Sequence, residues 1–563
     1  MYSQAKNVQI VTAILKEHGI NQMVISPGGT NAPFIKGVQD DPFFTCYSVV
    51  DERSALYFAI GIYLATGKPV AMCCTSAQAT RNYVPGLTEA FYKHVPILAI
   101  TFSKHPQYTG QDYMQAPNQT SLPVDAVRKT FSLPYVSNEH DRLHCERLVN
   151  EAILEMMHIV PAPVQLNVPM LDNELGLYTE DLLPKVKIIK RFAQKDLSNI
   201  NLDNKKILIV VGENRGYNDD AIINFVKSHN ALIYVNQLSN MRNDYTVEGN
   251  LMLSRITQEI FDKEYCPDIL ITIGGQTGDY PLYHKLSKST CDYEHWRISA
   301  GGEIVDTYDH LTRVYECSQD DFFNDVKPSN YDGGYIEKWR SFTNNYNTSI
   351  DLPLSNALAA QLLSSKIPEN SFVNFAILNS LRVWNLFHLK NKVKCFCNVG
   401  AFGIDGGMST FFGQSVMTNE LCYMIIGDLA FLYDMNSLSI RHIKNNARIV
   451  LVNNNGGMEF KYGCDTLNKN SIDRYIAAAG HFANADGWAT SNGFKYIPIK
   501  TKEEFFSNVE VLNRPSEAPI LMEIFTDDEK ENIAYTSIIR ANDYRTLSDK
   551  VIGKLKNKIK KCL

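Results

Sequence analysis

The sequence lacks any uninterrupted apolar stretch long enough for a membrane span, which needs about 18 or more apolar residues. Residues 1–20 also lack the features of a signal peptide, because their apolar run is short and interrupted and no small-residue cleavage site follows. The basic segment 550–563 is predicted to be a solvated terminal helix, with contact to a membrane surface as the alternative. We therefore expect no membrane partner.

The twelve cysteines include no CxxC pair. Most stand in apolar runs, and scattered cysteines in a long chain without a signal peptide are typical of reduced thiols in the cytoplasm. Cys395 and Cys397 could be metal ligands, but the single residue between them places both on one face of a strand without a second ligand pair. We therefore predict buried structural thiols and a cytoplasmic location.

Positive charge is in deficit, since 55 Lys and Arg stand against 61 Asp and Glu, for a formal net charge of −6. The sequence has no zinc-finger spacing, no RNP motif and no long stripe of Lys or Arg. Nothing in it predicts attraction to nucleic acid or to an anionic membrane surface. We therefore expect no nucleic-acid partner.

The sequence does contain a succession of apolar strands alternating with helices. At 563 residues the chain is too long for one hydrophobic core. Unbroken apolar strands separated by helices imply parallel sheets covered on both faces. Polar residues 172–204 indicate a linker, and the "KPSNYDGGY" stretch indicates another loop. We predict an α/β fold with three doubly wound parallel-sheet domains at residues 1–180, 190–335 and 354–563.

Two strand ends in the last domain carry oxygen ligands suited to a metal ion. An apolar strand ends at Gly427 and Asp428, and a second strand ends in the Asn-Gly cluster 453–457. In open α/β sheets, ligands bind at the carboxyl ends of strands. A carboxylate, an amide and a main-chain carbonyl suit Mg²⁺, which completes its shell with water and phosphate oxygens. The alternative is that Asp428 caps the following helix and the cluster is only a turn.

The stretches around these two strand ends resemble those of a known enzyme superfamily. The sequence resembles the thiamine diphosphate-dependent enzyme superfamily and, within it, most resembles the 2-succinyl-5-enolpyruvyl-6-hydroxy-3-cyclohexene-1-carboxylate (SEPHCHC) synthases of the menaquinone pathway. The matching stretches lie in both outer thirds of the chain, in the family's order. They are "SPGG…P" (26–33), "DERSALYFAIGIYLATGKPVA" (51–71), "TSAQATRNYVPGLTEA" (75–90), "APNQT" (116–120), "GAFGIDGGMST" (400–410) and "GDLAFLYDMNS…LVNNNGG" (427–457).

The resemblance implies a pyrimidine-binding first domain, a middle domain without cofactor chemistry and a diphosphate-binding third domain. The cofactors it implies are thiamine diphosphate and Mg²⁺. Asp428 and Asn455 match the side-chain ligands of the metal, and Gly457 matches its carbonyl ligand. Further positions in both outer domains match residues that bind the cofactor in the family, and Ile404 matches the apolar residue that supports its bent form. These positions are Gly28, Asn379, Ser380, Ile404 and Gly427.

Glu52 in the "DER" stretch matches the family's catalytic glutamate. In the family this carboxylate hydrogen-bonds the aminopyrimidine N1′ and stabilises the tautomer that removes the thiazolium C2 proton, most effectively in a dry pocket. The alternative is that Glu52 is an ordinary charge in the first turn of a helix. Gln119 matches an active-site amide of the family, and its alternative is an ordinary loop residue.

The positions that bind substrate carboxylates in the SEPHCHC synthases differ here. Thr30 and Val399 replace two family arginines, which pair with carboxylates in bidentate fashion. Lys104 and His105 stand in the family's "TADRP" stretch, and Arg81 stands where the family has a small residue. We therefore take Arg81, Lys104 and His105 as candidate substrate contacts, with surface or structural roles as the alternative.

The function expected from these observations is decarboxylation of a 2-oxo acid with transfer of the acyl carbanion to an acceptor carbonyl or enone. The first alternative is SEPHCHC synthase itself, with relocated cations. The second is a non-catalytic subunit with the same fold, for binding or regulation. In the family the glutamate and the metal site come from different subunits, so we expect a homo-oligomer, dimer or tetramer, with active sites at the subunit interface.

Overall fold

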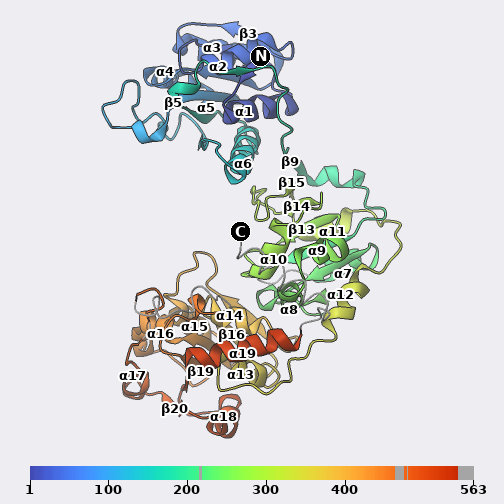
Figure 1. The fold of residues 1–563 in the computed structure, drawn as a ribbon, viewed down its shortest axis with the longest axis vertical. Helices are drawn as coiled ribbons and strands as arrows, with labels where there is room; N and C mark the ends of the chain where they lie inside the picture. Colours follow the sequence, from blue (N-terminus) through green and yellow to red (C-terminus); the bar gives the residue numbers. More distant parts are fainter. Residues whose placement is uncertain (215–218, 463–474, 479, 543–563) are drawn as a thin grey trace, which may run out of the picture. The chain divides into compact units, whose positions relative to one another are not determined.

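The computed structural model describes residues 1–214, 219–462, 475–478 and 480–542, so the helix predicted over 550–563 lies outside the described residues. The described chain divides into two compact units (Figure 1). One comprises residues 1–192 and 302–314, and the other residues 193–301 and 315–563. Within the described ranges, every helix is too short or too polar to span a lipid bilayer.

The first unit is built on a six-stranded parallel sheet with the order β3-β2-β4-β5-β7-β6. Every residue of β4 and β7 is buried, because helices cover both faces of the sheet. The strands are β2 (Gln22–Ile25), β3 (Thr45–Ser48), β4 (Val70–Cys74), β5 (Ile97–Lys104), β6 (Thr130–Ser132) and β7 (Val164–Met170).

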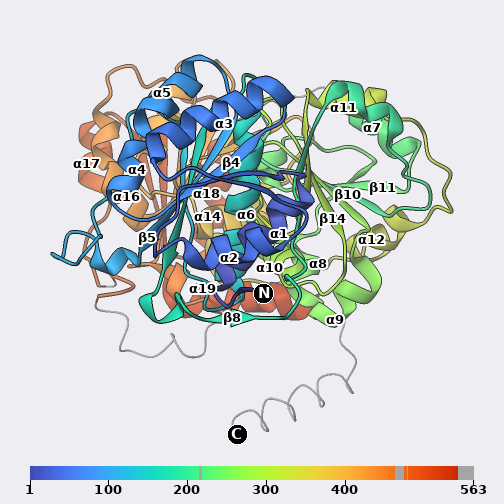
Figure 2. The same cartoon turned by 90° about the horizontal axis from the view of Figure 1, so that it is seen from above.

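The helices of this unit pack in two layers. Helices α1, α2 and α6 share one core cluster with the sheet, and α3 and α5 share the other (Figure 2). Their bounds are α1 (Lys6–Glu17), α2 (Ala32–Asp40), α3 (Glu52–Thr66), α4 (Gln78–Asn82), α5 (Val84–Tyr92) and α6 (Glu139–Met156). A two-stranded antiparallel ribbon joins β1 (Tyr2–Ser3) and β8 (Tyr178–Thr179).

The second unit begins with a parallel sheet in which β12, β11, β10, β13 and β14 are neighbours in that order. The strands are β10 (Ile207–Val211), β11 (Ala231–Tyr234), β12 (Thr246–Val247), β13 (Ile269–Ile273) and β14 (Glu294–Ile298). The chain passes between the units within β9 (Lys190–Ala193) and β15 (Leu311–Glu316). The main helices are α7 (Asp219–Lys227), α8 (Asn250–Arg255), α10 (Tyr280–Ser287), α11 (Gln319–Asp325) and α12 (Tyr335–Thr343).

A third sheet, also parallel, lies in the second unit and has the order β17-β16-β18-β19-β21-β20. Its strands are β16 (Phe372–Phe375), β17 (Lys394–Cys397), β18 (Cys422–Gly427), β19 (Ala447–Asn453), β20 (Lys495–Ile499) and β21 (Ile520–Phe525). Helices α13 (Asn356–Leu363), α14 (Asn379–Trp384), α18 (Lys502–Asn508) and α19 (Asp528–Ala541) cover one face. Helices α15 (Gly407–Ser415), α16 (Asp428–Asp434) and α17 (Asp486–Ser491) cover the other.

The first and third sheets share one topology. In each, the strands numbered along the chain lie in the spatial order second, first, third, fourth, sixth, fifth. The direction of winding therefore reverses between β2 and β4 in one sheet and between β16 and β18 in the other. Such switch points are where open α/β sheets bind ligands. The predicted α/β class with doubly wound parallel sheets is confirmed.

Candidate functional site

Asp428 lies at the switch point of the third sheet. Strand β18 ends at Gly427, and helix α16 begins at Asp428, which is only 4% exposed. Its Oδ2 accepts hydrogen bonds from the backbone N–H groups of Asn454 and Gly456, at 3.1 Å each. The structure thus brings the acid and the Asn-Gly loop of the neighbouring strand together, as the sequence predicts. A buried carboxylate whose backbone contacts are all N–H groups favours an added cation.

A histidine that the sequence motifs do not identify also contacts this carboxylate. His481 Nε2 lies 3.1 Å from Asp428 Oδ2. His481 follows Asp428 by 53 residues and belongs to no recognisable motif, so no sequence signal would have linked the two. The acid therefore has one side-chain neighbour that can itself be charged.

The loop after β19 presents oxygen atoms beside Asp428. Asn455 has a left-handed backbone, with φ of 66°, and an exposed side chain for which the described residues offer no hydrogen bond. Asn454 Oδ1 is buried without a hydrogen-bond partner among the described residues. Gly457 is held by its N–H group, which donates to Ala477 O at 2.6 Å. This set of a carboxylate and amide oxygens fits a hard cation such as Mg²⁺.

The other side of this switch point is formed by the start of α14. Asn379 follows β16. In the amide orientation that gives both its nitrogen and its oxygen a hydrogen bond, the nitrogen donates to Glu459 Oε2 at 3.1 Å and the oxygen accepts from Glu459 N at 2.7 Å. Glu459 also pairs with Arg382, and burial raises the pKa of Glu459 above its ordinary value. Ser380 is buried beside them. Of the two predicted diphosphate contacts, Asn379 thus belongs to a network with Glu459 and Arg382, and Ser380 is its buried neighbour in the chain.

Ile404 lies in the turn before α15. It is half-buried and packs against the core clusters on both faces of the third sheet. Phe402, two residues earlier, has a left-handed backbone with φ of 58°, which is uncommon for a bulky residue. The packing therefore holds the side chain of Ile404 in a fixed place, as an apolar support requires.

In the first unit, Gly28 and Thr75 follow the two strands that flank the switch point. A Cβ atom on Gly28 would lie 2.3 Å from Thr75 Cβ, closer than any real contact. Only glycine lets the two loops approach so closely. The "SPGG" turn after β2 is thus explained by packing at the point where this sheet would bind a ligand.

Glu52 is the first residue of α3. The N-terminus of this helix is capped by Asp51, whose side chain accepts from the N–H groups of Arg53 and Ser54. The carboxylate of Glu52 instead accepts a hydrogen bond from Asn82 Nδ2 at 3.0 Å. Asn82 lies in the "TSAQATRN" stretch, from which only Arg81 was singled out on sequence grounds. Glu52 is thus an acidic residue of the first helical turn, as its alternative expects, and its carboxylate also has a side-chain contact with Asn82.

Gln119 is 3% exposed, and both ends of its amide are used within the protein. Its Oε1 accepts from Ala77 N at 2.9 Å, and its Nε2 donates to Phe102 O at 3.1 Å and to Asn167 Oδ1 at 3.0 Å. This network ties the segment around Gln119 to the loop after β4. Its predicted role in the active site stays a prediction.

The three candidate substrate contacts each have a partner within the chain. Arg81 donates to Ser121 O and Asn118 O, both at 2.8 Å, and so fixes the loop that contains Gln119. Lys104 forms an ion pair with Asp172. His105 caps the short helix that follows it, by accepting from Gln107 N.

The positions where family arginines are replaced are both buried. Thr30 is 2% exposed, and its hydroxyl lies 3.2 Å from the Ser76 hydroxyl. Val399 is 1% exposed and belongs to the core of the third sheet. Neither position can present a cation to a substrate in this chain.

Known proteins resemble this chain over nearly its whole length. The family model "Thiamine pyrophosphate enzyme, N-terminal TPP binding domain" matches residues 6–122. Proteins named 2-succinyl-5-enolpyruvyl-6-hydroxy-3-cyclohexene-1-carboxylate synthase, from Bacteroides thetaiotaomicron and Phocaeicola vulgatus, are each 33% identical over 94% of this chain and 98% and 97% of their own. This chain belongs to the SEPHCHC synthase family of thiamine diphosphate enzymes. A protein of the same name from Flavobacterium johnsoniae is 28% identical over 93% of the chain.

Membership of the SEPHCHC synthase family confirms the superfamily and the branch predicted from the motifs. It supports the alternative function, SEPHCHC synthase, better than the more general carboligase that the replaced arginines suggested. It does not test the roles of individual residues, which stay predictions.

Proposed function

We propose that the chain is a thiamine diphosphate- and Mg²⁺-dependent SEPHCHC synthase. It would decarboxylate 2-oxoglutarate and transfer the remaining acyl group to isochorismate. The observation that carries this proposal is the similarity to synthases of that name along almost the entire chain. The contact between Asp428 and the Asn-Gly loop at a switch point supports the cofactor chemistry.

The third domain would hold the metal and the diphosphate. Asp428 and Asn455 would contribute side-chain oxygens to Mg²⁺, and Gly457 its carbonyl. The backbone at Gly427 lacks a Cβ and allows close approach of an anion. Asn379 and Ser380 would contact the diphosphate from the start of α14.

The first domain would act at the other end of the cofactor. When bound, thiamine diphosphate supplies the electron sink for the carbon that loses CO₂. Glu52 would share a proton with N1′ of the aminopyrimidine, and the hydrogen bond from Asn82 orients its carboxylate. Gly28 and Gln119 would shape the pocket around this group, and Ile404 would support the cofactor from the third domain.

A second candidate is a carboligase that acts on a different pair of substrates. It is favoured by Thr30 and Val399, which are buried where the family has arginines. Losing two guanidinium partners would cost a dicarboxylic substrate a few kcal/mol of binding in all. Arg81, Lys104 and His105 would then contact the substrate only after exchanging their present partners within the chain.

One assay separates these candidates. The chain with thiamine diphosphate and Mg²⁺ is given 2-oxoglutarate with isochorismate, and separately a panel of other 2-oxo acids that includes pyruvate, and CO₂ release and the ligated product are measured. Turnover of the first pair supports SEPHCHC synthase, and turnover of another acid alone supports the second candidate. Cofactor binding without CO₂ from any acid would favour the non-catalytic subunit instead.

Glu52→Gln provides the control for this assay. Because the amide cannot hold the proton at N1′, we expect CO₂ release to fall about 100-fold or more while thiamine diphosphate still binds. Equal turnover by this variant would refute the role assigned to Glu52.

We also propose that the enzyme is a homo-oligomer, a dimer or a tetramer. Helix α3, which starts with Glu52, leaves Tyr57, Phe58 and Leu64 exposed. Large apolar side chains on one exposed helix are typical of a surface that a second copy covers. A cytoplasmic location stays part of the proposal.

A further inference from the structure

A buried amide on a neighbouring helix holds both ends of α14. Asn356 is the first residue of α13 and is 4% exposed. Its Nδ2 donates to the main-chain carbonyl oxygen of Asn379 at 3.2 Å, and its Oδ1 accepts from Trp384 Nε1 at 3.1 Å. Asn379 and Trp384 are the first and last residues of α14. One side chain therefore fixes this short helix along its whole length.

Asn356 is itself held by a buried acid. Its backbone N–H donates to Glu531 Oε1 at 2.8 Å, and Glu531 Oε2 accepts from the Tyr462 hydroxyl at 2.9 Å. Glu531 lies on α19 and is 1% exposed, and Tyr462 lies just beyond Gly457 in the chain. The two segments with proposed cofactor contacts, α14 and the loop after β19, are thus linked through Asn356 and Tyr462 to one carboxylate.

The turn before α14 needs such support. Leu378 has φ of 64° and ψ of −123°, a region disfavoured for residues with a Cβ, which persists only where surrounding contacts fix it. The carbonyl of Asn379 is bound by Asn356, and its side-chain amide is bound by Glu459. Among the described residues, Glu459 takes one of the two hydrogens on the amide nitrogen of Asn379, which leaves the second for a ligand.

We propose that Asn356 is a positioning residue of the cofactor site, which holds the start of α14 so that Asn379 and Ser380 meet the diphosphate already in place. This inference rests on the proposed function, in which those two residues contact the diphosphate. Contacts that are fixed before binding spare the cost of ordering them when the ligand binds. Asn356 acts through α14 and not by contact with the cofactor.

The test is the Kd of thiamine diphosphate, measured by isothermal titration calorimetry on the full chain in Mg²⁺ buffer. Without the amide of Asn356, the start of α14 must be ordered as the cofactor binds, so we expect Asn356→Ala to raise the Kd about tenfold. Gln361→Ala is the matched control. Gln361 lies on the same helix, and its amide donates to the carbonyl oxygens of Thr348 and Ile350 instead. It should lower the melting temperature and leave the Kd unchanged.

A split between cofactor affinity and turnover separates positioning from a general loss of stability. The diphosphate is not the reacting end of the cofactor. Asn356→Ala should therefore need about tenfold more thiamine diphosphate for half-maximal CO₂ release, and should reach wild-type turnover once saturated. If this variant does not fold, Trp384→Phe takes its place, because it removes the N–H that orients the Asn356 amide and keeps an aromatic ring in the core. We expect its Kd to rise about threefold.

Each outcome decides for or against this role. Wild-type affinity in Asn356→Ala, or in Trp384→Phe where the first variant does not fold, would overturn the role of Asn356 and leave the proposed function standing. An equal rise of the Kd in Gln361→Ala, or turnover that stays low at saturation, would also overturn it. A wild-type chain that does not bind thiamine diphosphate would refute the proposed function and this role together.

Discussion

Asp428 is a buried carboxylate whose described partners are backbone N–H groups and one imidazole. It is also the only carboxylate in the proposed metal site. We therefore expect Asp428→Ala to weaken thiamine diphosphate binding in Mg²⁺ buffer about tenfold or more, which a cofactor titration measures. The matched control is Asp434→Asn in the same helix, where the carboxylate contacts Ser409 instead. Unchanged affinity of the alanine variant would refute the metal site.

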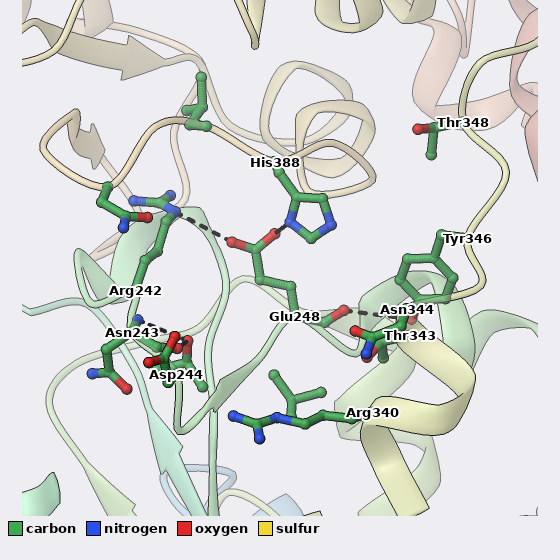
Figure 3. A pocket seen from close by; sticks show the side chains of 14 residues that line it. Arg242, Asn243, Asp244, Glu248, Arg340, Thr343, Asn344, Tyr346, Thr348 and His388 are labelled. Carbon is green, nitrogen blue, oxygen red and sulfur yellow. Dashed lines mark hydrogen bonds and ion pairs between the residues drawn. The ribbon is translucent and has the colours of Figure 1, made fainter. Parts of the chain in front are cut away.

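His388 Nδ1 lies 2.5 Å from Glu248 Oε2, and this pair makes stability depend on pH (Figure 3). The pKa of His388 is raised above 6.5 by its hydrogen bond to Glu248, so its contribution is complete below pH 6.5 and is lost as the pH rises through the folded-state pKa. Burial alone would raise the pKa of Glu248, but contact with His388 and Arg242 holds that pKa below 4.5. The stabilisation that Glu248 contributes is therefore complete above pH 4.5 and is lost as the pH falls through the folded-state pKa.

The pair therefore stabilises the fold most between about pH 4.5 and 6.5. We expect His388→Ala to have a lower melting temperature than the wild type. The difference should be largest near pH 5.5 and should shrink towards pH 9, which thermal denaturation at several pH values measures. His442→Ala removes a histidine that contacts Arg441 rather than a carboxylate and serves as control. A difference from the wild type that stays constant with pH would contradict this prediction.

The sequence could predict Asp428 and the Asn-Gly loop because both follow apolar strands directly, and strand ends meet at one edge of a sheet. It could not predict the contact of Asn82 with Glu52 or of His481 with Asp428, because each joins residues far apart in the chain and neither has a fixed spacing. It also could not show that Lys104 is paired with Asp172, 68 residues further on.

At the scale of elements, two of the helices that follow switch-point strands, α4 and α14, begin with strained turns. Ala77 precedes α4 with φ of 70° and ψ of −123°, and Leu378 precedes α14 with φ of 64° and ψ of −123°. This region is disfavoured for residues with a Cβ and costs about 1–3 kcal/mol. Both turns lie beside predicted cofactor contacts, where such strain often serves to fix a loop.

Ala77→Gly tests this strain. Glycine relieves the left-handed conformation but loses more chain entropy on folding, so we expect a net gain of about 1 kcal/mol in the free energy of unfolding. Denaturant unfolding measures this change. Ala59→Gly in the regular helix α3 is the control and should lose about 1 kcal/mol or more, because it also removes a buried methyl group. A loss of stability in Ala77→Gly would show that the turn is not strained.

The elements themselves were predictable to different degrees. Buried strands such as β4 and β10 are continuous apolar runs, and their positions follow from the sequence. Strand β3, with residues Thr45–Ser48, is polar and half-exposed, and the sequence pattern alone does not identify it. The strand order, which creates the two switch points, depends on pairing between distant segments and so could not be derived from local patterns.

At the scale of the whole molecule, the shared topology of the first and third sheets supports the proposal that each binds one part of the cofactor. Each sheet presents one switch point, and the predicted residues divide between the two: Gly28 and Glu52 in the first, Asp428 and Asn379 in the third. The alternation of strands and helices in the sequence predicted a doubly wound parallel sheet in each of these domains. It could not show that their strand orders are identical.

The proposed sharing of active sites between copies predicts that two inactive variants restore each other. If one copy supplies Glu52 and the other supplies Asp428, a mixed dimer of Glu52→Gln and Asp428→Ala has one intact site and one doubly altered site. Random exchange of subunits makes about half of the dimers mixed, so we expect about a quarter of the wild-type activity after the two variants are unfolded and refolded together. CO₂ release from the substrate that the wild type uses measures this recovery.

Mixing Glu52→Gln with wild-type chain that carries no second change gives the reference for subunit exchange. Because each variant alone lacks every complete site, no recovery in a preparation where mixed dimers are present would show that each copy builds its active site alone.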